Sequence, residues 1–275
     1  GDILDQFTKS GYEVTIHITQ NGKDAREKAK YACSAGYDLI VCAGGDGTLS
    51  QCLHGIMASK NKPPVGYIPA GSTNDFARTL GIPKNTMDAV KWITHGTPME
   101  IDIGSFNNRY FTYIAAFGAF TNVTYETSQQ VKNVLGHASY ILNGLTQLTN
   151  LRSKLMRIEY DGNVLEDDFI FGAVSNSTSM GGILTLDPKQ VDMRDGKFEL
   201  LLVRAPKSLA EIGECLQALQ SQKYNCGMIT FLSTEKLKVY AKTSMPWSLD
   251  GERADGREEI EIENLHHAIR LMQKE

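Results

Sequence analysis

A short apolar run that leads into a glycine-rich turn is the feature that most limits how this chain can fold. Residues 40–49 read IVCAGGDGTL, so apolar residues give way to three glycines, an aspartate and a threonine. A continuous apolar run of this length, residues 39–43, is typical of a strand covered on both faces, as in a parallel sheet. The turn that follows is therefore expected at the carboxyl end of a parallel strand, where ligands bind in such sheets.

The segments around this run alternate between helical and strand patterns. Leu4 and Phe7 indicate a helix that ends at Gly11. Four apolar residues then alternate with polar ones, which predicts a half-buried strand: Tyr12, Val14, Ile16 and Ile18. Further patterns predict helices over 22–35, 47–59 and 86–96, the last with Thr86 as its N-cap, and a strand over 65–68. The alternation predicts an α/β domain with a mostly parallel sheet over residues 1–103.

After Glu100 the pattern changes to short strands. Asn-Asn and Asp-Gly pairs, which are typical of hairpin turns or bulges, separate them: Asn107-Asn108, Asp161-Gly162, Asp195-Gly196, Asp250-Gly251 and Asp255-Gly256. Two helical stretches, about 137–150 and 207–221, interrupt the strands. We therefore expect a β-rich second domain over residues 104–275.

The composition excludes some classes of protein. A net charge of -4 over 275 residues does not supply the clustered basic surface that nucleic-acid binding needs. The five cysteines are odd in number and lack CxxC spacing, which indicates reduced core thiols, and no apolar run is long enough to span a membrane. These features predict a cytoplasmic protein. His266 and His267 look like surface residues, and their spacing is not that of zinc ligands.

The glycine-aspartate turn has the chemistry of a phosphate site. Glycines let the backbone approach a phosphate closely, and the amides that begin the next helix favour negative charge. The turn is neither a Walker A loop nor a GxGxxG motif, and it contains no lysine. A magnesium ion, organised in part by Asp46, is then expected to neutralise the charge of a nucleotide. The alternative is a plain tight turn between a strand and a helix.

A second motif, GYIPAGSTNDFARTLGIP at residues 66–83, follows the GGDGT turn. The pair at this spacing resembles the diacylglycerol kinase catalytic domain of the soluble bacterial lipid kinases, which are related to sphingosine, ceramide and NAD kinases. Later blocks keep the family's order and extend the resemblance over nearly the whole chain: EIDIG, AAFGAFTNVTYET, LGHASYILNGL, VSNSTSMGG, DMRDGKFELLLV and SLDGE. The resemblance implies a domain like that of NAD kinases, a C-terminal all-β sandwich, and an active site in the cleft between them.

The resemblance also implies roles for individual residues. Glu252 is the implied catalytic proton acceptor, supported by Asp250, and Asp75 and Arg78 belong to the active-site network. Seven residues would contact ATP: Gly44, Gly45, Asp46, Gly47, Thr48, Ser50 and Ser72. The side chain of Asp195 and the backbone carbonyls of Asp192 and Lys197 would bind Mg²⁺. From the residues alone, Glu252 and Asp195 could equally be solvated hairpin tips.

Three features depart from the family pattern. The family opens with a strand and an N-P-x-[SA]-G turn that have no counterpart in this sequence, and serines stand at 50 and 72 where asparagine and threonine are usual. Without the opening strand, ladder groups would lack partners, so we expect weak ATP binding by this chain and about twenty further residues in the natural protein.

The sequence thus predicts an ATP-dependent kinase that transfers the γ-phosphoryl group to the hydroxyl of diacylglycerol or a related lipid. A kinase of a soluble acceptor such as NAD and a catalytically weak lipid-binding relative are the alternatives. The uncharged run over residues 110–125 could line an acyl site or pack in the core, and LRSKLMR at 151–157 could touch an anionic membrane transiently or be a solvated helix end. A homodimer is compatible with the resemblance, but no stretch of sequence indicates one.

Overall fold

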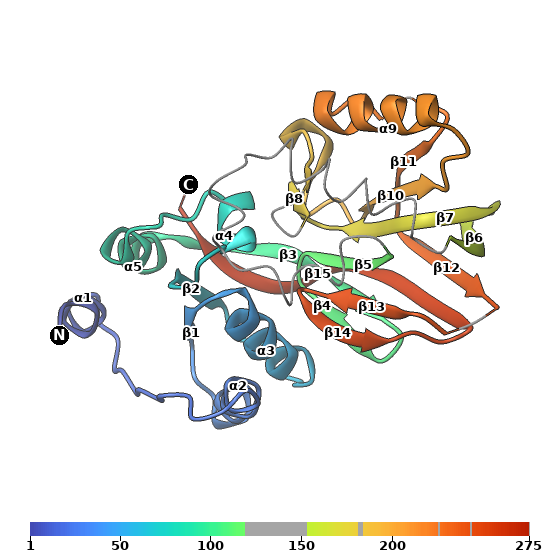
Figure 1. Cartoon of the computed structure of the whole chain (residues 1–275). Helices are drawn as coiled ribbons and strands as arrows, with labels where there is room; N and C mark the ends of the chain where they lie inside the picture. Colours follow the sequence, from blue (N-terminus) through green and yellow to red (C-terminus); the bar gives the residue numbers. More distant parts are fainter. Residues whose placement is uncertain (119–152, 181–183, 225, 243, 275) are drawn as a thin grey trace. The chain divides into compact units, whose positions relative to one another are not determined.

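The computed structural model describes residues 1–118, 153–180, 184–224, 226–242 and 244–274. The chain forms two compact units, Gly1–Ile103 with Leu265–Glu275, and Gly104–Asn264. It passes from one unit to the other within strand β3 (Thr97–Phe106) and again within strand β15 (Glu259–Gln273), and these two strands pair with each other (Figure 1). The first unit is therefore built from two separate parts of the sequence.

The first unit is an α/β structure with parallel strands, as predicted. Strand β1 (Ile40–Gly44) pairs in parallel with β2 (Val65–Pro69), and β2 pairs in parallel with β15 at Leu271. Five helices accompany them in the described part of this unit: α1 (Asp2–Lys9), α2 (Asp24–Ala35), α3 (Asp46–Met57), α4 (Asp75–Thr79) and α5 (Thr86–His95). Gly11 and Gly36 follow α1 and α2 with positive φ angles of 87° and 79°, which L-residues with a Cβ rarely adopt.

Three local predictions for this unit were wrong. The alternating residues 12–18 form no strand in the described structure, and Ile16 and Ile18 are 61% and 74% exposed, because alternation sets a preference whereas a ladder needs a neighbouring strand. Strand β1 is not covered on both faces, since Val41 is 37% exposed. The N-cap of α5 is Asn85 rather than Thr86, because the Asn85 side chain accepts the N–H groups of Met87 and Asp88.

The second unit is a β structure. Its long strand β7 (Asn163–Ser175) pairs antiparallel with β6 (Lys154–Tyr160), β5 (Ile114–Gly118) and β10 (Phe198–Arg204). The remaining described strands are β4 (Arg109–Phe111), β8 (Ser179–Met180), β9 (Leu184–Thr185), β11 (Ile229–Thr234), β12 (Lys236–Ala241), β13 (Pro246–Leu249) and β14 (Glu252–Asp255). A 3₁₀ turn spans Pro188–Gln190, and helix α9 (Leu209–Ser221) confirms the helix predicted over 207–221.

Three of the predicted hairpins close with two-residue turns, Asn107-Asn108 between β3 and β4 and two Asp-Gly turns. Asp161 and Gly162 join β6 to β7 with φ angles of 45° and 78°, and Asp250 and Gly251 join β13 to β14 with φ angles of 51° and 85°. Positive φ at both positions defines the type I′ turn that fits the twist of paired strands, and Asp-Gly is a preferred sequence for it. Residues 250–251 therefore fix the position of the next residue, Glu252.

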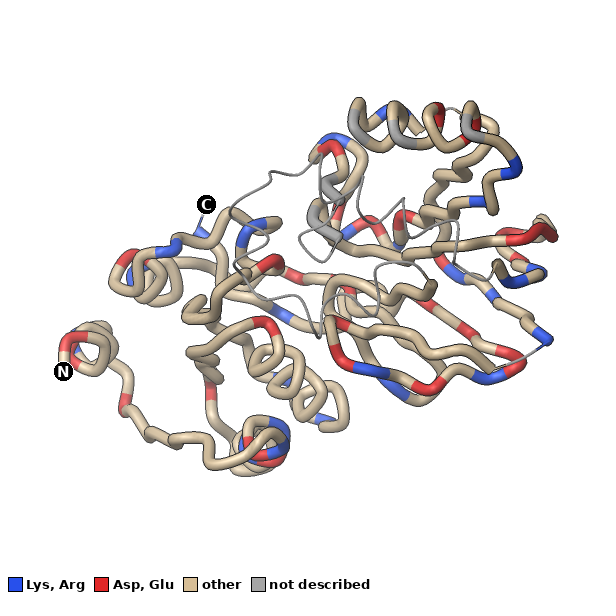
Figure 2. Tube along the Cα trace, viewed as in Figure 1, with Lys and Arg blue, Asp and Glu red and all other residues tan. Residues whose placement is uncertain are grey.

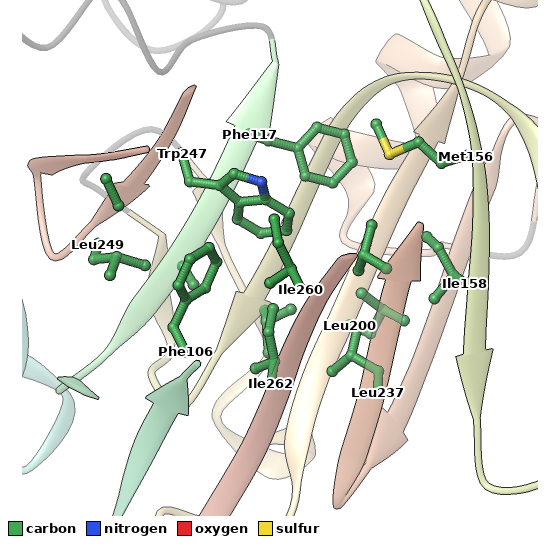
Figure 3. Packing of buried hydrophobic residues seen from close by; sticks show 14 of the residues in the cluster. Phe106, Phe117, Met156, Ile158, Leu200, Leu237, Trp247, Leu249, Ile260 and Ile262 are labelled. Carbon is green, nitrogen blue, oxygen red and sulfur yellow. The ribbon is translucent and has the colours of Figure 1, made fainter. Parts of the chain in front are cut away.

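A hydrophobic core fills the second unit around Trp247 (Figure 3). The rings of Phe106 and Phe117 lie 5.1 and 4.8 Å from the Trp247 ring, centroid to centroid. The described part of the uncharged run, up to Phe117, thus packs in the core, which was one of the two alternatives for it. The predicted helix over 137–150 and the start of the LRSKLMR segment lie outside the described residues, and the segment's last four residues belong to β6.

Charged residues of both signs are interspersed along the strands of the second unit (Figure 2). Lys236 lies 2.7 Å from Glu261 across the β12–β15 pair, and Lys238 lies 3.5 Å from Glu259. The described helices include none that is both long enough and apolar enough to cross a bilayer. All five cysteines are free thiols, and four of them are buried.

Candidate active site

The glycine turn joins β1 to α3 at the carboxyl end of the parallel strands. Gly44 ends β1, Gly45 is the N-cap, and Asp46 begins the helix. The Gly44 carbonyl accepts the hydroxyl of Tyr67, in the middle of β2, at 3.2 Å and the backbone N–H of Ala70, just after β2, at 2.8 Å. A Cβ on Gly44 would lie 2.7 Å from the Cβ of Thr48, so Thr48 covers this glycine closely.

The glycine turn touches the next motif backbone to backbone. A Cβ added to Gly71 would lie 2.5 Å from the Cα of Gly45, and one added to Gly45 would lie 3.2 Å from the Cα of Gly71. Contacts this short leave no room for a side chain at Gly71. The protein itself therefore needs glycine at position 71, whereas a Cβ at position 45 would be a tight contact that a small backbone shift could relieve.

Gly47 differs from its neighbours. It is exposed, its φ is not positive, and a Cβ added to it would have no atom within 4 Å. The packing of the described protein thus does not require glycine here. A ligand that approaches the first amides of α3 would require it, because the first N–H groups of a helix attract anions such as phosphate.

Asp46 connects the two motifs. One carboxylate oxygen accepts the N–H of Asp75 at 3.1 Å and the other accepts the N–H of Phe76 at 3.3 Å, at the beginning of α4. Burial, reinforced by the negative charge of Asp46, raises the pKa of Tyr67, so its hydroxyl stays protonated and donates to Gly44. Asp46 therefore holds the start of α4 against the glycine turn, a contact that the sequence did not reveal.

The other residues expected to contact ATP, Ser50 and Ser72, and those of the expected active-site network, Asp75 and Arg78, lie in the same two segments of the first unit. Asp75 is buried, and its carboxylate lies 3.4 Å from the guanidinium of Arg78, which is half exposed and also donates to the Thr73 carbonyl at 3.2 Å. Ser72 is exposed in the loop after β2, whereas Ser50 is buried one turn into α3. The hydrogen bonds of Asp46 and the contact between Gly45 and Gly71 bring these segments together.

In the second unit, Asp250 fixes the turn that carries Glu252. Its buried carboxylate accepts three backbone N–H groups, from Thr112 at 2.6 Å, Tyr113 at 3.0 Å and Ile114 at 3.1 Å. Burial raises the pKa of Asp250, and these three hydrogen bonds oppose that rise because they favour the charged form. Asp250 is thus a structural anchor of the hairpin, consistent with a supporting role beside Glu252.

Glu252 is half exposed at the start of β14, next to a cation that the sequence did not indicate. The guanidinium of Arg109 lies 3.9 Å from the Glu252 carboxylate and donates to the Arg253 carbonyl at 3.2 Å. Arg109 follows the Asn107-Asn108 turn, and only the folded hairpin brings it to β14. A half-exposed carboxylate held between a rigid turn and a guanidinium is suited to accept a proton from an incoming hydroxyl.

The turn expected to hold Mg²⁺, residues 192–197, lies just before β10 and carries two aspartates. Within it the Asp192 carboxylate accepts the Arg194 N–H at 3.1 Å, and the Asp195 carboxylate accepts the Lys197 N–H at 2.9 Å. Gly196 has a φ of 77°, and the Lys197 carbonyl accepts the Asn264 side-chain amide at 2.9 Å. The same Asp192 oxygen also accepts the Nε–H of the Arg194 guanidinium at 3.2 Å, so this carboxylate is already paired with a cation.

The surroundings of Glu199 favour the binding of a cation at this turn. It is buried, one of its carboxylate oxygens has no hydrogen-bond partner among the described residues, and it lies next to the two aspartates of the turn. Burial first, and then the charges of Asp195 and Asp192, raise the pKa of Glu199 to about 8. A bound cation would offset this excess of negative charge. The donor set of carboxylates and carbonyls fits Mg²⁺, which prefers oxygen ligands.

Comparisons with known proteins agree with these features. The family described as diacylglycerol kinase catalytic domain matches residues 1–106, and the family described as YegS C-terminal NAD kinase beta sandwich-like domain matches residues 115–273. A diacylglycerol kinase of Bacillus subtilis strain 168 is 35% identical over 271 residues, which cover 98% of this chain and 89% of the relative. A diacylglycerol kinase of Staphylococcus aureus strain bovine RF122 / ET3-1 is 34% identical over a match that covers 91% of this chain and 79% of the relative's length.

Solved structures have the same fold. The crystal structure described as that of a putative diacylglycerol kinase from Bacillus anthracis strain Sterne superposes with a TM-score of 0.80 at 25% identity. The match covers 98% of this chain and 89% of that protein's chain. A diacylglycerol kinase structure from the same strain, at 21% identity, gives a TM-score of 0.75 over 99% and 91% of the two chains. These findings confirm the predicted α/β unit followed by a β-sandwich-like unit. The chain belongs to the diacylglycerol kinase family and is a kinase that phosphorylates an alcohol group.

Proposed function

We propose that this protein transfers the γ-phosphoryl group of ATP to the hydroxyl of diacylglycerol or a related lipid, in transient contact with a membrane surface. The names of the two curated relatives support a diacylglycerol acceptor. The observation that carries the proposal is the glycine turn, which leaves Gly47 open at the start of α3 while Gly45 and Asp46 fix the turn to the next motif. The membrane contact is proposed by analogy with the family.

The first unit would bind the donor. The first amides of α3 would hold the terminal phosphates, with Thr48 and Ser72 as nearby hydroxyl donors. Arg78 is half exposed and supplies the positive charge that the lysine-free turn lacks. Asp46 and Asp75 would position these groups rather than contact the phosphates, because Asp46 already caps α4 and Asp75 lies against Arg78. Ser50 is buried, so it would support the helix from inside.

The second unit would activate the acceptor. A lipid hydroxyl is a weak nucleophile at neutral pH, so Glu252 would take its proton as the bond to phosphorus forms. Asp250 keeps Glu252 in place through its three amide contacts, and Arg109 orients the carboxylate. Asp195, with the carbonyls of Asp192 and Lys197, would hold Mg²⁺, and Glu199 lies beside this set. A bound Mg²⁺ would add positive charge beside Asp195 and Glu199, whereas the Asp192 carboxylate is already paired with the Arg194 guanidinium at 3.2 Å.

Substitution of the proposed base tests the catalytic assignment. Glu252→Gln should reduce turnover by about 10²- to 10⁴-fold while ATP affinity and thermal stability stay at wild-type values. The matched control is Glu258→Gln, a second exposed glutamate of the same unit, which should keep full turnover. Glu252→Gln with wild-type turnover would show that another group accepts the proton.

Substitution of Gly47 tests the donor site. Gly47→Ala has room in the protein and should leave the unfolding temperature unchanged or slightly raised, because alanine favours helix. If phosphate approaches the start of α3, the added methyl group should weaken ATP binding by about tenfold or more, which corresponds to ~1.4 kcal/mol. Gly213→Ala, in α9 and equally free of nearby atoms, is the control. If both variants bind ATP as tightly as the wild type, phosphate does not bind at this turn.

The acceptor is identified by incubation with labelled ATP, Mg²⁺ and a panel of diacylglycerol, ceramide and NAD. Labelled phosphatidic acid is the expected product. Labelled NADP would instead support a soluble acceptor, and transfer to none of the three would contradict the proposal. Cosedimentation with anionic and with neutral vesicles, each with and without diacylglycerol, tests the membrane contact separately.

A further inference from the structure

We propose that Asp102, His266 and His267 form a binding site for a divalent transition-metal ion, with Zn²⁺ as the best match. Asp102 lies on β3, and the two histidines lie on β15, the strand paired with β3. Among the described residues, this is the one group of three or more His, Cys, Asp or Glu side chains whose ligand atoms all lie within 4.8 Å of one another. All three residues belong to the first unit.

The backbone of β15 brings the two histidines together. Successive side chains of a regular strand point to opposite faces of the sheet. His267 has a φ of 53°, which breaks this alternation, and the His266 and His267 rings stack with centroids 3.6 Å apart and planes 28° apart. A positive φ is uncommon outside glycine and is worth explaining when it occurs. Here it gives two imidazoles on one side of a single strand.

Asp102 supplies a fixed third ligand. Its side chain is completely buried, and Oδ1 accepts the backbone N–H of His267 at 2.8 Å. The same oxygen lies 3.0 Å from Nδ1 of His266. Glu100 is two residues away on β3, and its carboxylate lies 2.9 Å from Nδ1 of His267. Glu100 thus holds the second ring in place, as a carboxylate next to a metal-binding histidine commonly does.

The distances fit a small tetrahedral ion. Zn²⁺ lies about 2.0–2.2 Å from nitrogen and oxygen ligands, so two ligands of one ion are about 3.3 Å apart. Nδ1 of His266 and Oδ1 of Asp102 are 3.0 Å apart, which is close to this separation. The ligand atoms of all three residues lie within 4.8 Å of one another, so small rotations of the histidine rings would bring them to one ion. Both histidines are half exposed, so their rings can rotate without disturbing the core.

The ligand types select the class of metal. Imidazole nitrogen suits Zn²⁺, Ni²⁺ and Cu²⁺, whereas Mg²⁺ and Ca²⁺ prefer sites built from oxygen. Two imidazoles, one buried carboxylate and a second carboxylate beside them would balance the charge of one divalent ion. This site is therefore distinct from the oxygen-rich turn around Asp195, and it would respond to a different ion.

The position of the site suggests what the ion would do. β3 and β15 are the two strands through which the chain passes between its units, at 103–104 and 264–265. An ion held by Asp102 on one strand and by the histidines on the other would cross-link these strands. It would stabilise the first unit and stiffen both connections.

Metal titration of protein freed of metal by chelation tests the proposal. We expect the wild type to bind one equivalent of Zn²⁺ at micromolar concentration, in competition with a fluorescent zinc indicator, and a large excess of Mg²⁺ to leave binding unchanged. Bound Zn²⁺ should raise the unfolding temperature. His266→Gln/His267→Gln should abolish both effects, and Glu100→Gln should weaken binding by about tenfold.

His95→Gln, which changes an exposed histidine of α5, is the matched control and should bind like the wild type. Each variant is first checked for the wild-type circular dichroism spectrum. If the double variant binds Zn²⁺ as tightly as the wild type, or if the wild type binds none at micromolar concentration, the proposal is wrong. Asp102→Asn is the less informative variant, because this buried side chain also accepts a backbone N–H.

Discussion

Asp46 accepts the backbone N–H of Asp75 at 3.1 Å, and through this hydrogen bond the first residue of α3 holds the beginning of α4. The same carboxylate accepts the N–H of Phe76 at 3.3 Å. Two sequence motifs separated by a strand thus share one acidic side chain. The conformation of the proposed phosphate site depends on this contact as well as on the glycines.

Asp46→Ala should therefore weaken ATP binding by about tenfold or more and lower the free energy of unfolding by about 1–2 kcal/mol, because two N–H groups at a helix start lose their acceptor. Isothermal titration with ATP and urea unfolding measure the two effects. Asp38→Ala, which removes an exposed carboxylate just before β1, should change neither. Unchanged ATP affinity in Asp46→Ala would show that the contact does not shape the site.

Gly71→Ala should destabilise the first unit, because the new methyl group would lie 2.5 Å from the Cα of Gly45. Overpacking of this kind costs about 1–3 kcal/mol. Gly213→Ala, with no atom within 4 Å of the added Cβ, should be neutral or stabilising. Thermal unfolding of the two variants gives the comparison, and equal melting temperatures would contradict the close contact.

Asp250→Ala should lower the free energy of unfolding by about 3 kcal/mol or more, because three buried N–H groups lose their acceptor at once. Asp250→Asn keeps one oxygen and should lose less. Asp255→Ala, at the exposed end of the same hairpin, should be neutral. The order of stability, measured in urea, should be Asp255→Ala, then Asp250→Asn, then Asp250→Ala, and any other order would contradict the anchor role.

Arg109→Ala should reduce turnover by about three- to tenfold with little change in ATP affinity, because it removes the cation 3.9 Å from Glu252 and the hydrogen bond to the Arg253 carbonyl. Arg253→Ala is the control, because it removes a guanidinium from the residue after Glu252, one that lies 3.9 Å from the exposed Asp255. Steady-state kinetics of both variants distinguishes the loss of a guanidinium next to Glu252 from the mere loss of one positive charge in this hairpin. Equal turnover in both would argue against orientation of Glu252 by Arg109.

Glu199 should make stability depend on pH. Its pKa rises from an ordinary 4.5 to about 8 in the folded protein, so the unfolded chain releases this proton at lower pH than the folded protein. The stabilising contribution is complete below about pH 4.5 and is lost as the pH rises through about 8, with a slope of at most ~1.4 kcal/mol per pH unit.

Urea unfolding in the presence of EDTA, from pH 5.5 to 9, measures this effect. Glu199→Gln should unfold with a flatter pH profile than the wild type, and the gain over the wild type should grow with pH. Glu235→Gln, at an exposed position, should follow the wild-type profile. Parallel profiles for the wild type and Glu199→Gln would mean that Glu199 is not buried next to the two aspartates.

Features set by local chemistry were predictable from the sequence. Asp-Gly pairs at 161–162 and 250–251 prefer the type I′ turn that the structure contains, and the glycines after α1 and α2 end those helices. Contacts between distant parts of the chain were not predictable. Nothing in the spacing of Arg109 and Glu252, or of Asp102 and the two histidines, reveals that they meet.

The strand predicted over residues 12–18 failed for the same reason. Alternation of apolar and polar residues records only a local preference, whereas a strand exists through its neighbour. The burial of Glu199 beside the Asp192–Asp195 turn was missed because a single glutamate within FELLLV gives no sign of its surroundings.

The route of β15 has a consequence for how the protein is made. β2 gains its partner at Leu271 only when the ribosome has completed the entire second unit, because β15 returns to the first unit after residue 264. During synthesis, strand β2 of the first unit therefore lacks its β15 partner until the β-sandwich-like unit has been produced. Nascent chains arrested before residue 265 should be far more sensitive to proteolysis in residues 40–70 than chains released in full.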